Sequence, residues 1–376
     1  MPRKRRVCFV TGTRAEFGLM ESTLVSIRNH PKLQLQIVVT GMHLDRRHGW
    51  SIRSIDFPID ATVPWATGMG SAVETARSTG RAISLLADAF DRLKSDVVLV
   101  VGDRVEAFAA ASAGHISGKI VAHVHGGDRA MGQVDDALRH AITKLSHIHF
   151  AATRQSAQRI RKLGENSERI FQVGAPGIDG VARAGSGSRH GLETRATGHF
   201  ALLVLHPVNG DDVEYRRAEL VLGAIKAIPF SRIVIVHPNN DPGSRGIARC
   251  WDQHAHDERL VIHRNLDRQQ FLGLLREAGV LVGNSSSGII EAASFGTPVI
   301  DIGPRQMGRE RSGNVTNVPY RKDAIVQALS RIWNNGRPKR FRGTNVYGGD
   351  GAGRKIAKVL SSVDMTDSLR RKLIAY

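Results

Sequence analysis

The chain has 376 residues, of which 41% are hydrophobic and 23% are charged, an ordinary composition for a globular protein. This length exceeds what one hydrophobic core usually supports, so we expect two domains. No apolar run approaches the roughly 20 residues of a membrane-spanning helix, and the run VCFV near the N-terminus is too short for a signal peptide. The two cysteines favour neither a disulfide framework nor a zinc site. We therefore expect a cytoplasmic protein without a membrane partner or a metal.

The net charge of +18 is the unusual feature of the composition. A basic protein can bind nucleic acid, an anionic membrane surface or an anionic small substrate. The sequence shows no helix-turn-helix or zinc-finger pattern, and its aromatic content of 5% is low for base stacking. We interpret the charge as a solvated basic surface, with electrostatic steering of an anionic substrate as the main alternative, and we expect no specific nucleic-acid partner. Binding to nucleic acid or a charged surface stays open as an alternative.

The first predicted unit is a strand over residues 7–10, a short turn, and a helix over 16–27. Arg14 lies near the start of that helix, where a cation and free N–H groups suit an anion. The turn lacks the G-x-G-x-x-G pattern and the lysine of a P-loop, so we predict neither a dinucleotide cofactor nor a P-loop NTPase. An ordinary tight turn explains the segment equally well. A second strand, 35–39, brings His43 to the same edge, where a plain loop histidine is the alternative.

Residues 49–70 are predicted to be loop with at most one short strand, and residues 72–93 a long helix. Two apolar runs follow, 97–101 and 120–124, which are typical of buried parallel strands. Ligands of open α/β sheets bind beyond the carboxyl ends of the strands, so ionisable residues there are expected to share one crevice. These residues are Asp103, Arg104 and Glu106 after the first run, and His123, His125, Asp128, Asp135, Asp136, Arg139 and His140 in and after the second.

Two local expectations concern this second group. Alternation along the strand places His123 and His125 on one face. A helix over residues 135–148 begins at the acids Asp135 and Asp136, and a surface ion pair between Asp136 and Arg139 is the plain structural alternative to a role in a site.

Residues 182–198 are rich in Gly, Ser and Arg and lack periodicity, which predicts a linker. We expect a first domain over 1–182, a second over 199–352, and a C-terminal segment over 353–376 whose long helix, 353–373, packs back toward the first domain. Strands are predicted at 200–205, 233–236, 260–262, 280–282 and 299–302. The fold class is therefore α/β, with two doubly wound Rossmann-like domains and a substrate in the cleft between them.

The second half contains its own candidate site. A polar turn enters a predicted helix, and its N–H groups and hydroxyls suit a diphosphate; it comprises Asn284, Ser285, Ser286, Ser287 and Gly288. Glu291 is expected in the first turn of that helix, where it suits ribose hydroxyls better than phosphates. His206 follows the first strand of this half, and Arg309 belongs to a loop able to reach an anion. A capped helix without a ligand is the plain alternative.

Six motifs, in this order along most of the chain, resemble the hydrolysing UDP-N-acetylglucosamine 2-epimerases of sialic acid synthesis: TGTRAEFG, TGMHLD, GDRVEA, HVHGGD, DDALRHAITKLSH and GNSSSGIIEAASFGTPVI. The resemblance implies the two-domain GT-B fold, no cofactor, and a homodimer or homotetramer. It also implies a reaction in which the C2 proton is removed and UDP is expelled to give a glycal. Water then adds at C1 and a proton returns at C2 from the other face, which gives N-acetylmannosamine.

The resemblance implies roles for several residues. Asp103 and Asp135 match the family's catalytic aspartates, and Glu291 matches the acid that binds ribose. The residues that match its nucleotide- and phosphate-binding positions are Arg14, His206, Ser285 and Ser286. Arg104, which we include in the predicted substrate-binding set, matches the arginine that follows the catalytic aspartate. The predicted substrate-binding set also contains four residues chosen for their place beside these motifs: His43, Asn284, Gly288 and Arg309.

The sequence departs from the family at two positions, because His125 and Asp128 each replace a common glutamate. Histidine can transfer protons near neutral pH, so we include both residues in the predicted catalytic set. Two alternatives follow from the resemblance: the same reaction on UDP-2,4-diacetamido-2,4,6-trideoxyhexose in legionaminic acid synthesis, or a GT-B glycosyltransferase that requires an acceptor.

Overall fold

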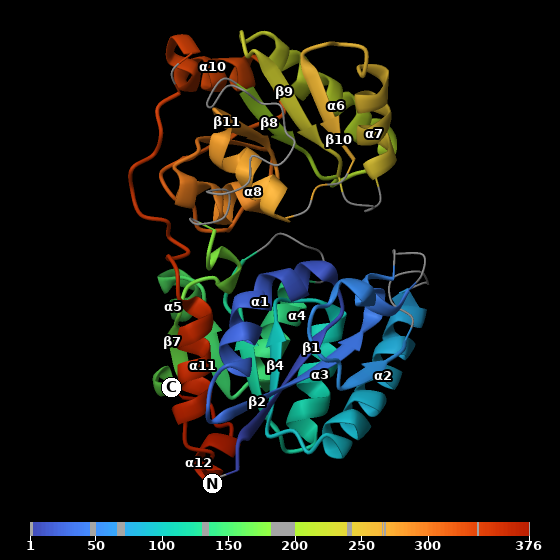
Figure 1. Cartoon of the computed structure of the whole chain (residues 1–376), viewed down its shortest axis with the longest axis vertical. Helices are drawn as coiled ribbons and strands as arrows, with labels where there is room; N and C mark the ends of the chain where they lie inside the picture. The colour runs from blue at the N-terminus through green and yellow to red at the C-terminus, as the bar shows by residue number, and fades with distance from the viewer. Residues whose placement is uncertain are drawn as a thin grey trace. The chain divides into compact units, whose positions relative to one another are not determined.

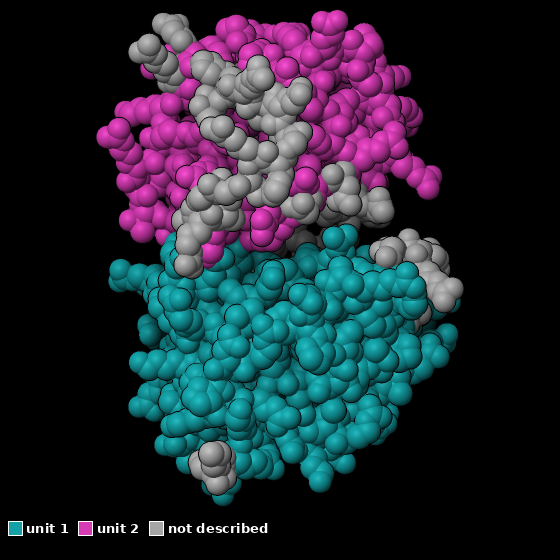
Figure 2. All heavy atoms as spheres, viewed as in Figure 1, with its two compact units in different colours: residues 1–179, 347–376 teal, residues 180–346 magenta. Residues whose placement is uncertain are grey.

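The structure is a computed structural model that describes residues 3–45, 50–65, 72–129, 135–181, 200–238, 243–264, 266, 268–336 and 338–375. The chain forms two compact units: unit 1 is Met1–Asp179 with Tyr347–Tyr376, and unit 2 is Gly180–Val346 (Figure 2). The predicted linker over 182–198 lies outside the described residues. Within the described part, no helix combines the length and apolar character that crossing a bilayer requires.

Unit 1 contains a seven-stranded parallel sheet in the order β3-β2-β1-β4-β5-β6-β7 (Figure 1). The strands are β1 (Arg5–Thr11), β2 (Leu33–Thr40), β3 (Ala61–Val63), β4 (Val97–Val101), β5 (Ile120–Val124), β6 (Ile148–Ala151) and β7 (Ile170–Gln172). The strand order reverses between β1 and β4. This reversal is the switch point at which open α/β sheets bind ligands.

The helices of unit 1 cover both faces of this sheet. They are α1 (Arg14–Arg28), α2 (Ala72–Arg92), α3 (Val105–Ile116), α4 (Asp135–Leu145), α5 (Arg154–Lys162), α11 (Ala352–Ser362) and α12 (Asp367–Arg370), with short 3-10 helices η1 (Gly41–Leu44), η3 (Ser51–Ser54), η4 (Ser167–Arg169) and η5 (Pro176–Ile178). Alternate residues of β1 enter two separate cores: Val7 and Phe9 pack on the side of α1 and α11, and Cys8 and Val10 on the side of α2 and α3. This alternation is what a two-sided parallel sheet requires.

The C-terminal segment belongs to unit 1, where α11 packs against α1. Asp179 accepts hydrogen bonds from the backbone N–H groups of residues 351, 352 and 353 at 2.8, 2.9 and 2.8 Å, which satisfies donors at the start of α11. The prediction of one long helix over 353–373 is wrong. Val363 has extended backbone angles, and Thr366 caps a separate short helix, α12.

Unit 2 contains a six-stranded parallel sheet in the order β10-β9-β8-β11-β12-β13. The strands are β8 (Phe200–Val204), β9 (Arg232–Val236), β10 (Leu260–His263), β11 (Val280–Gly283), β12 (Val299–Ile302) and β13 (Val315–Val318). The helices are α6 (Asp211–Lys226), α7 (Ser244–Gln253), α8 (Arg268–Glu277), α9 (Ser286–Ile290) and α10 (Lys322–Trp333), with 3-10 helices η6 (Ala292–Phe295) and η7 (Asn334–Gly336). Two doubly wound α/β sheets are therefore confirmed. Edge strand β13 was not predicted.

Candidate active site

The turn between β1 and α1 is built by a capping box. Thr13 Oγ1 accepts a hydrogen bond from the Glu16 N–H at 3.2 Å, and Glu16 Oε2 accepts from the Gly12 and Thr13 N–H groups at 2.8 and 3.0 Å. Arg14 is the first residue of α1 and its side chain is exposed. The predicted cation therefore lies at the helix N-terminus, on the solvent side of a rigid turn.

A second acid, Glu106, is buried beside this turn and is only 1% exposed. Two glycines make room for it: a Cβ on Gly12 would lie 2.5 Å from Glu106 Cγ, and one on Gly41 would lie 2.8 Å from Glu106 Oε1. Arg104 Nε donates to Glu106 Oε2 at 3.2 Å. Burial and the neighbouring charge of Glu106 raise the pKa of Glu16 to about 7. The sequence places Glu106 among the ionisable residues after β4 but assigns it no role. The two glycines, which lie in separate turns, were the sequence feature that could have indicated a buried side chain here.

His43 lies inside this same edge of unit 1 and is 0% exposed. Its ring nitrogens contact Thr11 Oγ1 at 3.1 Å and Ser51 Oγ at 2.9 Å. Burial lowers the pKa of His43 to about 4, and the charge of Arg14 contributes. The imidazole is thus neutral and engaged at both nitrogens, which fits a residue that positions η1 rather than one that contacts a ligand.

Asp103, which follows β4, accepts a hydrogen bond from the guanidinium of Arg139 on α4. The Arg139 side chain is 4% exposed and that of Asp103 is 21% exposed. The plain alternative of an Asp136–Arg139 ion pair does not describe this helix, since Asp136 Oδ2 instead lies 3.4 Å from His140 Nε2. The buried guanidinium of Arg139 thus fixes the carboxylate of Asp103, which directly follows β4.

His125 forms the second polar cluster of unit 1. Its Nδ1 lies 2.9 Å from Asp128 Oδ2, and Asp128 Oδ1 accepts a hydrogen bond from Ser156 Oγ at 2.6 Å. His125 Nε2 is buried and has no hydrogen-bond partner among the residues that the structure describes. A carboxylate that fixes one ring nitrogen defines the tautomer, so the other nitrogen is left available for proton transfer.

The backbone of His125 is in the left-handed region, with φ of +64°. This conformation costs a non-glycine residue about 1–2 kcal/mol and is common where a side chain must be aimed. The expectation that alternation places His123 and His125 together does not hold, since β5 ends at Val124. His123 contacts the Gly102 carbonyl oxygen at 2.8 Å and Thr143 Oγ1 at 3.2 Å, and burial lowers its pKa to about 3.

Asp135 is the first residue of α4. Its side chain lies outside what the structure describes, so its predicted catalytic role stays a prediction.

In unit 2, the loops after β8 and β11 are joined by Asn284. Its Oδ1 accepts from the His206 N–H at 2.7 Å, and its Nδ2 donates to the His206 carbonyl oxygen at 2.8 Å. The Asn284 carbonyl oxygen accepts from Arg305 and Gln306, both at 2.9 Å. Asn284 is 0% exposed, so its side chain positions the loops. His206 is half-buried, and burial, with the charge of Arg305, lowers its pKa to about 4.

The serine-rich turn follows β11. Ser285 caps α9, and its Oγ lies 2.8 Å from Ser287 Oγ. Ser285 and Ser286 are both partly exposed. Gly288 serves packing, because a Cβ there would lie 2.8 Å from Leu281 and 3.0 Å from Val299. α9 has only five residues, so a ligand here depends on hydroxyl and N–H donors more than on a helix dipole.

Glu291 is at the C-terminal cap of α9, not in its first turn as predicted. It is 6% exposed, and its Oε1 lies 2.8 Å from Arg268 Nη2. Burial raises the pKa of Glu291, while Arg268 acts in the opposite direction. Arg309 is partly buried, and its Nε has no hydrogen-bond partner in the structure. In contrast, neighbouring Arg311 is bound to Asp301 at 2.9 Å.

The fold and these clusters define a class: two doubly wound units of the GT-B type, one with carboxylates and a histidine at the ends of its strands and the other with a serine-rich turn. Residues 25–361 match the family model described as UDP-N-acetylglucosamine 2-epimerase. The chain belongs to this family.

Two relatives and one solved structure illustrate the similarity. A Legionella pneumophila subsp. pneumophila protein named UDP-N,N'-diacetylbacillosamine 2-epimerase (hydrolyzing) is 36% identical over 99% of this chain and 100% of its own. A UDP-N-acetylglucosamine 2-epimerase of Neisseria meningitidis serogroup B is 32% identical over 87% and 88%. The fold matches a Neisseria meningitidis UDP-GlcNAc 2-epimerase solved with UDP-GlcNAc, with a TM-score of 0.78 and 20% identity over 94% of this chain and 99% of that one.

Proposed function

We propose that the protein is a hydrolysing 2-epimerase that converts UDP-N-acetylglucosamine to UDP and N-acetylmannosamine. The geometry that supports this reaction best is the His125–Asp128 pair at 2.9 Å, which orients an imidazole and leaves its Nε2 buried without a partner. Family membership over residues 25–361 supports the substrate class.

In this proposal unit 1 carries proton transfer. The C2–H proton moves to a base while the C1–O bond breaks, so the electron pair of the C2–H bond becomes the C1–C2 double bond of a glycal and UDP departs. Water then adds at C1, and a proton returns to C2 from the opposite face. His125 and Asp103 are the groups proposed to transfer these protons, because each is held by a hydrogen bond: His125 Nδ1 donates to Asp128, and Asp103 accepts from Arg139. Asp135 is proposed as a further acid on the strength of the family resemblance.

Unit 2 is proposed to bind the UDP moiety. Ser285 and Ser286 supply hydroxyl and N–H donors for the diphosphate, and Glu291 accepts hydrogen bonds from ribose hydroxyls. His206 and Arg309 are proposed to contact the phosphates, since each keeps a ring or guanidinium nitrogen without a hydrogen-bond partner. Charge stabilisation of the departing diphosphate is the largest contribution that such a site can make.

The remaining predicted binding residues fall into two groups. Arg14 and Arg104 are proposed to attract the diphosphate from unit 1, where the Arg14 side chain is exposed and that of Arg104 is 42% exposed. His43, Asn284 and Gly288 are proposed to act by positioning, because each is buried. The net reaction is redox-neutral, so no redox cofactor is proposed. A cytoplasmic homodimer or homotetramer also stays a proposal from the family resemblance.

A second candidate substrate is UDP-2,4-diacetamido-2,4,6-trideoxyhexose. The relative named for UDP-N,N'-diacetylbacillosamine favours it, because that relative is 36% identical over 99% of this chain. A site that hydrogen-bonds an extra acetamido group rejects the substrate that lacks it by a large factor, so a comparison of the two sugars is decisive.

The test is release of UDP from both sugar nucleotides, without an acceptor, with NMR identification of the sugar. A free 2-epimeric sugar together with UDP supports the proposal, and the ratio of kcat/KM values selects the substrate. Turnover that needs an acceptor and yields a glycoside would indicate a glycosyltransferase. No UDP release from either nucleotide would refute the proposal.

A further inference from the structure

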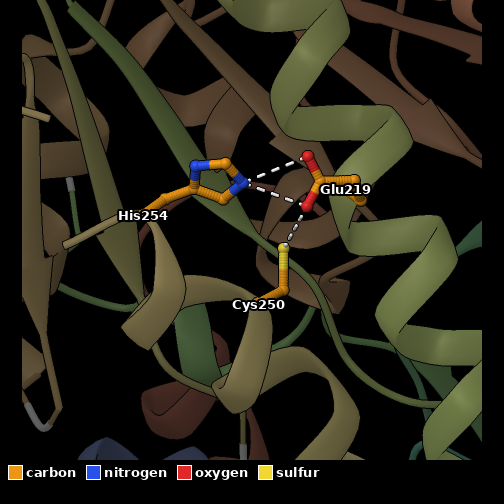
Figure 3. A group of neighbouring side chains, drawn as sticks. All are labelled: Glu219, Cys250 and His254. Carbon is orange, nitrogen blue, oxygen red and sulfur yellow. Dashed lines mark hydrogen bonds and ion pairs between the residues drawn. The ribbon is translucent and has the colours of Figure 1, made fainter. Parts of the chain in front are cut away.

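Glu219, Cys250 and His254 form a compact cluster in unit 2 outside the site described above (Figure 3). One ligand atom from each lies within 4.8 Å of the other two. Glu219 lies on α6 and Cys250 on α7, and His254 is the C-terminal cap of α7. Thiolate, imidazole and carboxylate are the three protein ligands that zinc uses.

We propose that these three side chains bind one divalent transition-metal ion of the zinc class, with water as the fourth ligand. This proposal does not depend on the enzymatic function proposed above. It also departs from the expectation from the sequence that two cysteines do not favour a zinc site, since only one cysteine is used.

The distances between the side chains match those around a tetrahedral zinc ion. With Zn–N, Zn–O and Zn–S bonds of about 2.0–2.3 Å, the nitrogen–oxygen edge is about 3.4 Å and the sulfur–oxygen edge about 3.6 Å. Here Cys250 Sγ lies 3.6 Å from Glu219 Oε2, and His254 Nε2 lies 3.0 Å from the same oxygen. The nitrogen–oxygen edge has to lengthen by a few tenths of an ångström, which a rotation of the Glu219 carboxylate supplies. The ligand atoms of Cys250 and His254 lie within 4.8 Å of each other.

The fold fixes this arrangement before a metal binds. Cys250 and His254 are four residues apart, so they face the same side of α7. α6 and α7 approach closely, because a Cβ on Gly246 would lie 1.8 Å from the Asp211 carbonyl oxygen. Cys250 is 0% exposed, and the side chains of Glu219 and His254 are 45% and 25% exposed. The thiol is therefore rigid, while the other two ligands leave a path for an ion from solvent.

The ammonium group of Lys226 lies next to the cluster and has to move slightly when a metal binds. Lys226 Nζ lies 3.5 Å from His254 Nδ1, and it also lies 3.0 Å from Asp257 Oδ2. Metal binding at Nε2 shifts the ring proton to Nδ1, so Lys226 has to turn toward Asp257, which it already contacts. The Cys250 thiol loses its proton to solvent, and binding is therefore expected to weaken as the pH falls.

The position of the cluster indicates a structural role. Glu219 lies eight residues beyond the start of α6, about 12 Å along the helix axis from the loop that carries His206. A metal held there would clamp α6 to α7 without touching the proposed UDP-binding residues. We therefore expect it to raise the stability of the protein and not to serve as a catalytic ion.

Titration of the untagged full-length protein with Co²⁺, followed by absorption spectroscopy, tests the proposal. The expected result is one Co²⁺ per chain, with a thiolate-to-cobalt charge-transfer band and the visible bands of tetrahedral cobalt. Cys250→Ser should remove the charge-transfer band. The matched control, Cys8→Ser, removes the other buried cysteine, which lies in unit 1, and should keep the band.

Two further variants keep the test decisive if Cys250→Ser folds poorly. Glu219→Gln and His254→Gln change partly exposed side chains, and each should weaken Co²⁺ and Zn²⁺ binding at least tenfold and abolish the rise in Tm that Zn²⁺ produces. His256→Gln, a nearby exposed histidine outside the cluster, should leave both unchanged. Absence of a stoichiometric Co²⁺ complex, or binding that none of these variants affects, would overturn the proposal.

Discussion

Arg139 on α4 donates a hydrogen bond to Asp103, the acid that directly follows β4. The guanidinium is almost fully buried while the carboxylate is partly exposed, with side-chain exposures of 4% and 21%. A buried guanidinium that binds a partly exposed carboxylate fixes the direction of that carboxylate, as expected of a group that transfers protons at the edge of a sheet.

Asp103→Asn should therefore lower kcat by about 100- to 10,000-fold, the range typical of a lost acid or base. UDP affinity should stay nearly unchanged, because the proposal gives Asp103 a role in proton transfer and no contact with UDP. Steady-state kinetics and calorimetric titration with UDP measure the two quantities. The matched control is Asp136→Asn, which removes a carboxylate on α4 that pairs with His140 instead. Near-normal turnover in Asp103→Asn would remove Asp103 from the mechanism.

Substitutions of His125 should have different effects on the stability of the protein but the same effect on its activity. Because its φ is +64°, His125→Gly should be more stable than His125→Ala by about 1 kcal/mol. Both variants should lose at least 100-fold in kcat, since neither can accept a proton at Nε2. Urea unfolding and turnover assays on the pair decide this. Equal stabilities would mean that the backbone relaxes without glycine, and retained activity would exclude His125 as a proton carrier.

Stability should fall on mild acidification because unit 1 buries neutral histidines. Burial lowers the pKa of His43 to about 4, so the unfolded chain, with a histidine pKa near 6.5, binds a proton first as the pH falls. The stabilisation of the folded state that comes from neutral His43 is fully present above pH 6.5 and is lost as the pH falls toward 4. Between pH 7 and pH 5, this one residue should account for about 2 kcal/mol of lost unfolding free energy.

Urea unfolding of the wild type, His43→Gln and the exposed control His256→Gln at pH 7 and pH 5 measures this effect. His43→Gln should show a weaker pH dependence than the wild type, and His256→Gln should match the wild type. An identical pH dependence in all three proteins would show that His43 is not buried in its neutral form.

The close packing of Glu106 against Gly12 can be tested with a second glycine, Gly80, as the control. Gly12→Ala places a Cβ 2.5 Å from Glu106 Cγ, and overpacking of this kind costs about 1–3 kcal/mol. Gly80→Ala, at an exposed position on α2 with no atom within 4 Å, should instead stabilise by about 1 kcal/mol. Thermal unfolding of the two variants gives the comparison. An unchanged Tm in Gly12→Ala would mean that the Glu106 side chain moves easily to make room for the added methyl group.

The fold was largely predictable because its strands are continuous apolar runs. Strands β4, β5 and β12 begin and end at the predicted residues. Strand β13, with the sequence VTNV, was missed because its two central residues are exposed at the sheet edge and break the apolar pattern. The break after α11 was missed since residues 363–366 carry no proline or glycine.

The site was less predictable, because a sequence gives side chains but not their partners. The pairing of Arg139 with Asp103 joins residues 36 positions apart, whereas the only partner that the sequence suggested for Arg139, as an alternative, was Asp136 on the same helix. Glu291 was placed in the wrong part of its helix because α9 ends after five residues. The positive φ of His125 was not predicted either, since only a few per cent of non-glycine residues adopt it.

The fate of the C2 proton tests the proposed reaction most directly. UDP-N-acetylglucosamine and its 2,4-diacetamido-trideoxy analogue are each incubated with the protein in D₂O, and the products are examined by ¹H NMR. We predict UDP and a free sugar of inverted C2 configuration that carries one deuterium at C2. A product that keeps its original hydrogen at C2, or that appears only with an acceptor, would contradict epimerisation by proton removal.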